Sequence, residues 1–254
     1  MRKFIDQMGR QVEINLPVTR VISLVPSITE YLVDLGVNVV GRTKFCIHPK
    51  GKVEDIPVIG GTKQFRFEEI ADLSPDLIVG NKEENYPEGI NELDKDHSVW
   101  MSDIKNLEDA ERMMLMLGHL LDEPERAQHL VSRLKMRLSG LKNSHDGRVL
   151  YLIWRNPWMA AGTDTYIHHF LTWLGYKNVI LDSRYPEIAT PKKFQILNPQ
   201  EVLLSSEPFP FKKEHVEELR HHLPNARVRL VDGEIYSWYG TRLLNKELKL
   251  GDNF

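Results

Sequence analysis

The sequence predicts an α/β protein made of two similar lobes, each built on a parallel sheet, with a stiff helix between them. Short apolar runs alternate with helical segments in the N-terminal part, and the same order returns in the C-terminal part. Strand, helix, strand order is typical of a parallel sheet with covering helices. An amphipathic helical segment separates the two parts. We therefore expect an N-terminal lobe over 1–105, connecting helices over 106–146 and a C-terminal lobe over 147–254.

The first lobe is expected to begin with a short hairpin over Phe4–Ile14, turning at Gly9. Ser27 and Glu30 have capping-box spacing, so a helix should begin there, and Gly36 should close it as a left-handed cap. The short apolar runs that follow predict buried strands, and the remaining periodic segments predict short helices. The expected strands are Val21–Val25, Val39–Thr43, Leu77–Val79 and Val99–Met101, and the expected helices are Phe67–Leu73 and Ile90–Leu93.

The connecting segment reads as two helices, the first from Leu107 and the second from Pro124 to Asn143. Proline is tolerated at a first helical position because its missing N–H would have no helical partner there. About 20 residues at roughly 1.5 Å each give a rod about 30 Å long, which is enough to span a small domain. We expect a stiff connector between lobes. The alternative is an ordinary amphipathic helix within one domain.

The second lobe repeats the order of the first. Leu35-Gly36 before Asn38 matches Leu174-Gly175 before Asn178, and Leu73-x-Pro75 matches Leu197-x-Pro199. Matching over a whole lobe indicates an internal duplication, with a repeat too long for a solenoid. The expected strands are Val149–Trp154, Asn178–Ile180, Val202–Leu204 and Val228–Val231, and the expected helices are Tyr166–Leu174, Lys192–Leu197, Lys212–Leu223 and a tail over Ser237–Leu250.

Composition excludes several classes of function. The net charge of −3 does not indicate nucleic acid or an anionic membrane as a partner. No apolar run approaches the roughly 18 residues of a membrane span. The chain begins MRKF and then turns polar, without the apolar core of about 7–15 residues that a secretory signal needs. Two explanations remain open: a leader was removed, or the protein stays in the cytoplasm.

The loops after the strands hold the expected ligand-binding residues, because ligands of open α/β sheets bind outside the carboxyl ends of the strands. Aromatic side chains with arginine among them suit a flat or bulky ligand that carries carboxylates or phosphates. The alternative is that some of these rings only fill the lobe surfaces. The candidates are Phe45, His48, Tyr86, Trp154, Arg155, Trp158, Tyr185, Trp238 and Tyr239.

Neither a metal site nor a catalytic site is expected. Cys46 and His48 could supply a thiolate and an imidazole, but a structural zinc site needs four ligands and Cys46 is the only cysteine. Glu83 and Glu84 could act as paired carboxylates, although loop charges explain them as well. The sequence lacks the nucleophile elbow, phosphate loop, dinucleotide fingerprint and zinc-protease motif. We therefore expect no catalytic residues and no intrinsic cofactor.

Two motifs together resemble a known family. The pattern D-x-x-G-R-x-V from Asp6, continued by R-V-I-S-L-x-P-S-x-T-E over Arg20–Glu30, is similar to the opening of the periplasmic binding proteins for ferric siderophores, haem and cobalamin. The segment FEEIADLSPDLIV over Phe67–Val79 resembles the second characteristic sequence motif of that family. The resemblance implies two three-layer lobes joined by a long rigid backbone helix, with a shallow cleft that closes little on binding.

The same resemblance implies a function. The chain would be the substrate-binding protein of an ABC importer in the periplasm or cell envelope, and a metal chelate (ferric siderophore, haem or corrinoid) would be its ligand. The positions that match two tryptophans of the cobalamin member are Thr62 and Asn81, so its specificity is not carried over. The alternatives are a cytoplasmic protein that handles a metal cofactor and an enzyme acting on a bulky cofactor.

The resemblance also implies docking of one acidic residue from each lobe onto arginines of the permease. The motif places the first at Glu68, at the start of a helix where the helix dipole favours a carboxylate. We expect Glu68 to be exposed, with Phe67 and Ile70 supplying the buried face. In the second lobe the internal repeat places Lys192 at the equivalent position. Glu187 lies about a turn away and is the expected substitute.

Overall fold

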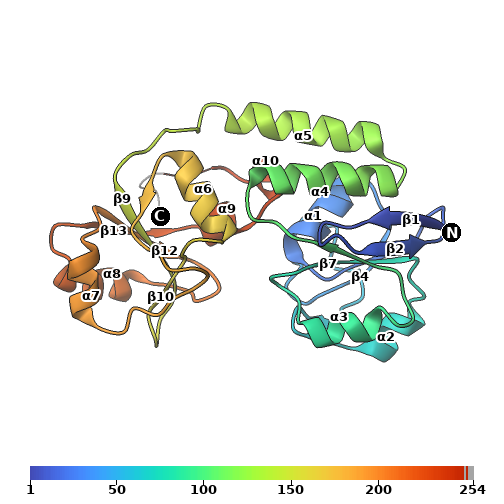
Figure 1. Cartoon of the computed structure of the whole chain (residues 1–254), viewed down its shortest axis with the longest axis horizontal. Coiled ribbons are helices and arrows are strands. Elements are labelled where there is room, and N and C mark those ends of the chain that lie inside the picture. The colour runs from blue at the N-terminus through green and yellow to red at the C-terminus, as the bar shows by residue number, and fades with distance from the viewer. Residues whose placement is uncertain (249, 251–254) are drawn as a thin grey trace. The chain divides into compact units, whose positions relative to one another are not determined.

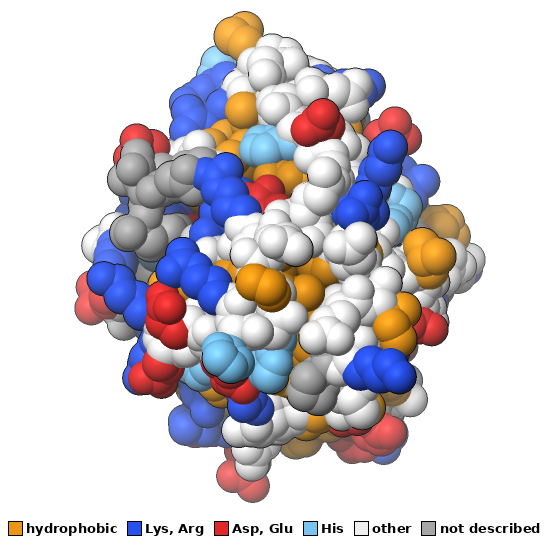
Figure 2. Space-filling model, turned by 90° about the vertical axis from the view of Figure 1, so that its left-hand side faces the viewer, with side chains coloured by type: hydrophobic (Ala, Val, Ile, Leu, Met, Phe, Trp, Pro, Cys, Tyr) orange, Lys and Arg blue, Asp and Glu red, His pale blue; other side chains and the backbone are white. Residues whose placement is uncertain are grey.

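The computed structural model describes residues 1–248 and 250, and the chain divides into two compact units (Figure 1). Unit 1 comprises Met1–Ile104, Glu108–Leu134 and Tyr239–Asn245. Unit 2 comprises Lys105–Leu107, Lys135–Trp238 and the described residues from Lys246 onward. On the face shown in Figure 2, basic and acidic side chains are interspersed, which agrees with the small net charge of −3.

Unit 1 is built on a four-stranded parallel sheet with the order β4-β3-β7-β8. The strands are β3 (Val21–Ser23), β4 (Val39–Arg42), β7 (Leu77–Asn81) and β8 (Val99–Ser102). All residues of β3, β7 and β8 are buried, which is typical of a sheet covered on both faces. The expected N-terminal hairpin is confirmed as antiparallel β1 (Arg2–Ile5) and β2 (Gln11–Ile14).

Helices cover the unit 1 sheet on both sides (Figure 1). They are α1 (Pro26–Leu35), α2 (Phe67–Asp72), α3 (Pro87–Leu93), α4 (Leu107–Leu120) and the short α10 (Arg242–Asn245). Gly36 closes α1 in the left-handed conformation, at φ 86°, as predicted. The capping box at the start of α1 is wrong, because the N-cap is Val25 and no side chain caps the helix. Pro26 occupies the first turn instead, where it leaves no amide hydrogen without a partner.

Glu30 is buried in α1 and does not cap the helix. Its side chain has no exposed area and pairs at 3.2 Å with the buried guanidinium of Arg242 from α10. Asn245 also donates a hydrogen bond to the Glu30 carboxylate, at 3.1 Å. The sequence motif that ends in Glu30 thus ties α1 to a helix near the other end of the chain.

The second connecting helix, α5 (Pro124–Leu138), begins at the predicted proline and is shorter than predicted. It has 15 residues and ends before Asn143, which has a positive φ of 54°. One stripe of its apolar side chains is buried, as expected of an amphipathic helix: Ala127, Leu130, Val131, Leu134 and Leu138. The division between unit 1 and unit 2 falls within α5, between Leu134 and Lys135.

Unit 2 has a sheet with the order β10-β9-β12-β13, and β11 pairs with the same strand β9. The strands are β9 (Arg148–Trp154), β10 (Met159–Ala160), β11 (Lys177–Asn178), β12 (Glu201–Ser205) and β13 (Arg227–Val231). All of these pairings are parallel except β10 with β9. The parallel order β11-β9-β12-β13 repeats the order β4-β3-β7-β8 of unit 1, as an internal duplication requires.

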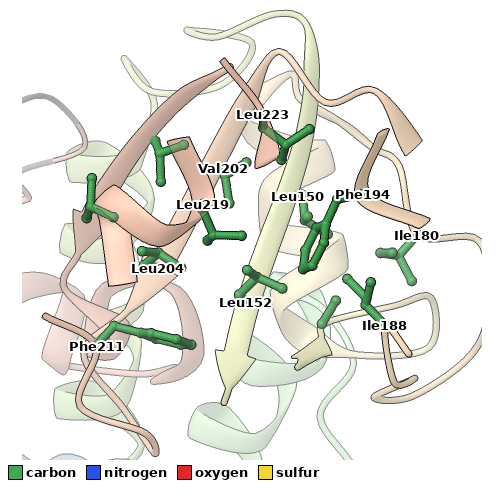
Figure 3. Packing of buried hydrophobic residues seen from close by; sticks show 13 residues of the cluster. Leu150, Leu152, Ile180, Ile188, Phe194, Val202, Leu204, Phe211, Leu219 and Leu223 are labelled. Atoms are coloured by element: carbon green, nitrogen blue, oxygen red, sulfur yellow. The ribbon is translucent and has the colours of Figure 1, made fainter. Parts of the chain in front are cut away.

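Alternate residues of β9 serve the two faces of the unit 2 sheet, as the period of two along a strand requires. Leu150 and Leu152 pack in the cluster shown in Figure 3, together with side chains from two covering helices. Tyr151 points to the other face, where its ring lies 5.3 Å from that of Tyr236. The helices of unit 2 are α6 (Tyr166–Leu174), α7 (Pro191–Leu197), α8 (Lys213–His222) and α9 (Gly233–Ser237).

Three further segments differ from the prediction, besides α5, the start of α1 and the expected strand Asn178–Ile180, which forms as β11 over Lys177–Asn178. The tail expected to be helical over Ser237–Leu250 forms the short helix α10, after extended backbone at Trp238 and a positive φ of 80° at Gly240, while α9 ends at Ser237. Residue 249 of the expected tail lies outside the described residues. The loop before α2 contains a small hairpin of β5 (Gly60–Gly61) and β6 (Gln64–Phe65). It depends on Gly60, because a Cβ there would lie 2.2 Å from a backbone oxygen. The third segment is β10, where only a loop was expected.

Candidate functional site

In unit 1, the loop after β4 exposes one large aromatic ring at the carboxyl edge of the sheet. Phe45 is 49% exposed, and the ammonium of Lys44 lies 5.0 Å from its ring centroid. His48 follows in the same loop and is partly exposed. Cys46 between them is fully buried and lies 3.0 Å from the Thr29 hydroxyl and 3.1 Å from that of Thr43. Burial raises the pKa of this thiol, so Cys46 fills the core as a neutral side chain.

The other unit 1 candidates lie deeper. Tyr86 precedes α3 and is half-buried, with its ring 4.9 Å from that of Phe65. Tyr239 is buried, and burial raises the pKa of its hydroxyl well above the ordinary value, although hydrogen bonds with Ser27 and Ser102 oppose the shift. The phenol is therefore neutral, and Tyr239 is part of the packed interior of unit 1.

The loop after β7 has a defined backbone. The side-chain oxygen of Asn81 accepts a hydrogen bond from the Glu83 amide at 2.8 Å, and the Asn85 oxygen accepts from the Asn81 amide at 2.8 Å. Glu83 and Glu84 are half-buried beside these asparagines. The two glutamates are therefore held near the carboxyl edge of the unit 1 sheet.

In unit 2, the end of β9 exposes Trp154. This side chain is 38% exposed, and its ring meets Phe209 edge-on at 5.7 Å. Phe209 lies in the loop after β12, so two neighbouring strands of the sheet supply one aromatic surface at its carboxyl edge. Sequence reasoning missed Phe209, although its place a few residues after a predicted strand was a usable signal.

Trp158 and Arg155 are engaged within unit 2. The ring of Trp158 stacks on Phe211 at 5.8 Å and packs against the hydrophobic cluster of Figure 3. The Arg155 guanidinium lies 4.5 Å from the Trp158 ring and binds the carboxylate of Glu218 at 2.7 Å. The arginine that was expected to meet an anionic ligand is thus already paired with a carboxylate of α8.

Tyr185 and Trp238 lie in different surroundings. Tyr185 is partly exposed in the loop after β11, with the Arg184 guanidinium 5.7 Å from its ring. Trp238 is buried, and its indole N–H donates to a carboxylate oxygen of Glu207 at 2.7 Å. Burial raises the pKa of Glu207, whereas the hydrogen bonds from Ser237 and Trp238 lower it less strongly. Glu207 was not among the expected residues.

The expected docking residues lie on exposed surface. Glu68 is exposed in α2, as predicted, and Ile70 is buried, whereas Phe67 is 38% exposed and does not supply a fully buried face. In unit 2, Lys192 is exposed in α7 and Glu187 is exposed before it. The two equivalent helices therefore present opposite charges in their first turns.

The described ranges contain neither a group of side chains arranged to bind a metal nor a helix that could span a membrane. No group of three or more His, Cys, Asp or Glu side chains in 1–248 and 250 is arranged to hold a metal ion. None of the helices in that part of the chain has the length and apolar character that a membrane crossing requires.

Known proteins are similar to this chain in sequence and in fold. The vitamin B12-binding protein of Salmonella paratyphi A is 28% identical over 172 residues, which cover 66% of this chain and 64% of that protein. The chain thus spans less than two thirds of the length of this relative. The uncharacterized ABC transporter substrate-binding lipoprotein YvrC of Bacillus subtilis is 24% identical, covering 98% of this chain and 83% of that protein.

The structural comparison agrees with the sequence comparison. The crystal structure of the periplasmic vitamin B12 binding protein BtuF of Vibrio cholerae superposes with a TM-score of 0.77 at 20% identity, covering 90% of this chain and 93% of that one. The family model described as periplasmic binding protein matches residues 21–218, which include most of both units. The chain therefore belongs to the periplasmic binding protein family.

Proposed function

We propose that this protein is the substrate-binding component of an ABC importer and that its ligand is a metal chelate: a ferric siderophore, haem or a corrinoid. The proposal rests mainly on the match to the periplasmic binding protein family. The names of the relatives, a vitamin B12-binding protein and an ABC transporter substrate-binding lipoprotein, support the same role. Its task is binding and delivery, not catalysis.

The geometry of each unit supports a bulky ligand with apolar faces. Phe45 and Trp154 each expose a large ring at the carboxyl edge of a parallel sheet, where ligands of α/β proteins bind. Exposed rings of this size are costly to leave in water and favour packing against a flat or bulky apolar surface. Phe209 extends the aromatic surface in unit 2.

The importer role implies a location and a partner. We place the protein in the periplasm or cell envelope, with the permease of the importer as its partner. Glu68 is the proposed contact on unit 1, and Glu187 is the proposed acidic contact on unit 2. Both are exposed, as docking residues must be.

Binding of coloured chelates tests the proposal. The full chain is titrated with cyanocobalamin, hemin and ferrioxamine B while tryptophan fluorescence, absorbance and the melting temperature are followed. We expect one chelate to quench the fluorescence, raise the melting temperature and saturate at one equivalent. Trp154→Ala should weaken its binding by about 1–3 kcal/mol, the usual range for a central aromatic contact.

Trp173→Phe is the matched control, because Trp173 lies in α6 and stacks on Phe170 at 5.8 Å, within the fold of unit 2. It should leave the chelate affinity unchanged. If none of these chelates, nor any other ferric siderophore in an extended panel, binds the wild-type chain, the proposed function is wrong.

A further inference from the structure

The carboxylate of Glu207 is held at the carboxyl edge of the unit 2 sheet, two residues after β12. Its Oε1 accepts a hydrogen bond from the Trp238 indole at 2.7 Å and another from the Ser237 hydroxyl at 2.8 Å. The backbone is fixed as well, because the Ser205 hydroxyl donates to the Glu207 carbonyl at 2.5 Å. The backbone of Glu207 and one of its carboxylate oxygens are therefore both held by hydrogen bonds.

The fold leaves space for this side chain. A Cβ at position 233 would lie 2.4 Å from the Ser205 hydroxyl oxygen and 2.6 Å from the Glu207 Cγ, so the first residue of α9 has to be glycine.

Only one oxygen of the Glu207 carboxylate is used within the fold. Both hydrogen bonds to the carboxylate end on Oε1. Among residues 1–248 and 250, no side chain or amide donates to the other oxygen, Oε2. Glu207 is partly exposed, and Oε2 is the carboxylate oxygen that these hydrogen bonds leave available to another donor.

The charges around Glu207 are predominantly negative. Asp232 and Glu234 follow β13, the neighbouring strand, and lie close enough to raise the pKa of Glu207 further. Lys246 is the cation between them, and its ammonium binds both carboxylates, at 2.6 Å for Glu234. Two of these three carboxylates, Asp232 and Glu234, thus share the Lys246 ammonium, and the contacts of Lys246 do not include Glu207.

The arginines of unit 2 near this edge do not make the surroundings of Glu207 positively charged. Arg155 is paired with Glu218 through two hydrogen bonds, at 2.7 and 3.2 Å. Arg184 stacks over Tyr185 in the loop after β11, which is separated from β12 by β9. A ligand carboxylate placed at Oε2 of Glu207 would meet like charge, whereas an amide or ammonium N–H or a hydroxyl would find a fixed acceptor.

We infer that Glu207 is a specificity residue whose Oε2 accepts a hydrogen bond from an N–H or O–H donor on the periphery of the bound chelate. The inference rests on the proposed function and narrows it. The ligand is a chelate decorated with amide, hydroxyl or ammonium groups, and a chelate whose periphery carries carboxylates is rejected.

Competition among chelates for the wild-type chain tests whether it prefers a chelate that carries donor groups to one that carries carboxylates. Cyanocobalamin carries peripheral amides, ferrioxamine B carries amides and an ammonium group, and hemin carries two carboxylates. We expect one of the first two to bind at least about tenfold more tightly than hemin, the usual magnitude for one charge-assisted hydrogen bond. Tighter binding of hemin than of both donor-bearing chelates overturns the inference and leaves the proposed function standing. Failure of every chelate to bind overturns both.

The variant Glu207→Gln tests the residue itself. Glutamine keeps the oxygen that Trp238 and Ser237 contact and replaces Oε2 with an amide donor. The affinity for the preferred donor-bearing chelate should fall roughly 10- to 100-fold, while that for hemin should stay the same or rise. Glu217→Gln is the matched control, since it removes one carboxylate from the exposed face of α8 and should change neither affinity.

The readout that decides is the ratio of the two affinities, because a general loss of folded protein lowers both in the same proportion. An unchanged ratio in Glu207→Gln overturns the role of Glu207. If this variant does not fold, Glu207→Asp withdraws the carboxylate by one methylene and should lower the same ratio.

Discussion

Among single residues, the buried pair of Glu30 and Arg242 joins distant parts of the sequence. Neither side chain is more than 8% exposed, and Asn245 donates a hydrogen bond to the glutamate. Two charges buried together contribute little net stability compared with an apolar pair, but one charge left alone in the interior is costly. The pair therefore specifies how α10 packs on α1.

Removing one member of this pair should destabilise unit 1 strongly. We expect Glu30→Ala to lower the free energy of unfolding by about 3–5 kcal/mol, because Arg242 would remain buried without its carboxylate. Glu92→Ala is the control, since its pair with Lys95 is exposed and should contribute less than about 0.5 kcal/mol. Urea unfolding followed by circular dichroism measures both. A loss below 1 kcal/mol for Glu30→Ala would show that water reaches this pair.

Trp158 and Trp154 lie a few residues apart and have different surroundings. Trp158 stacks on Phe211 and meets Phe194 edge-on at 5.8 Å, so Trp158→Ala should open a cavity beside the unit 2 core and cost about 3 kcal/mol of stability. Trp154 is partly exposed, so Trp154→Ala should cost less than about 1 kcal/mol. Denaturant unfolding of the two variants without ligand measures the difference. Equal losses would contradict this assignment of Trp158 to the core.

At the scale of the elements, the duplication extends to the way each sheet begins. In unit 1, the Asp76 carboxylate accepts hydrogen bonds from the Thr19 and Arg20 amides just before β3, at 2.7 and 2.9 Å. In unit 2, the Gln200 side-chain oxygen accepts from the Arg148 amide at the start of β9, at 2.8 Å. The same structural task is performed by a charged group in one unit and by a neutral group in the other.

This difference predicts a pH dependence specific to unit 1. Partial burial favours the neutral form of Asp76, but the hydrogen bonds from Thr19 and Arg20, with the charge of Arg20, outweigh it and lower its pKa. A carboxyl whose pKa is lower in the folded state stabilises the fold above its unfolded pKa of about 3.9, and this contribution is lost as the pH falls through the folded value.

Asp76→Asn should therefore lower the free energy of unfolding at pH 7, and its difference from the wild type should shrink as the pH falls below about 4. Gln200→Ala is the control within the other unit, and its difference from the wild type should not change over that range. Chemical unfolding at a series of pH values measures both. A pH-independent difference for Asp76→Asn would mean that its charge does not contribute.

The elements that sequence patterns predicted best are those whose cause is local. Leu77–Val79 is a continuous apolar run because both faces of β7 are covered, and Gly36 and Gly175 end their helices at positive φ. The strand β10 was missed because it exists through pairing with β9, which a local pattern does not encode. Ser27 with Glu30 looked like a cap because the partner of Glu30 lies near the end of the chain.

Local sequence patterns were limited in the same way at the candidate site. The rule that loops after strands bind ligands selected Phe45 and Trp154, which are exposed, as well as Trp238 and Tyr239, which are buried. Side-chain direction in irregular backbone depends on contacts distant in sequence. Glu207 was missed because its two hydrogen-bond donors lie 30 and 31 residues further along the chain.

At the scale of the whole molecule, the duplication is not symmetric in charge. The helices α2 and α7 are equivalent, since each leads through a proline into the third parallel strand of its sheet order. In α2 the first turn carries exposed Glu68, whereas in α7 it carries exposed Lys192. Ile196, which is 73% exposed, adds an apolar side chain to the surface of α7. A permease with two identical arginine sockets would attract the first helix and repel the second.

Transport measurements can separate the two helices. Glu68→Lys should abolish uptake of the chelate, because it places a cation against the arginine socket proposed for unit 1. Glu88→Lys makes the same charge change in the first turn of the neighbouring helix α3 and should leave uptake near the wild-type rate.

Lys192→Glu should leave uptake unchanged or raise it, since it places on α7 the acidic group that a permease with two identical arginine sockets would bind. Chelate affinity should stay constant in all three variants, because each side chain is exposed and none is among the residues proposed to contact the chelate. Normal uptake by Glu68→Lys would remove Glu68 from the docking surface. A loss of uptake in Lys192→Glu would instead show that the permease has an acidic socket for α7.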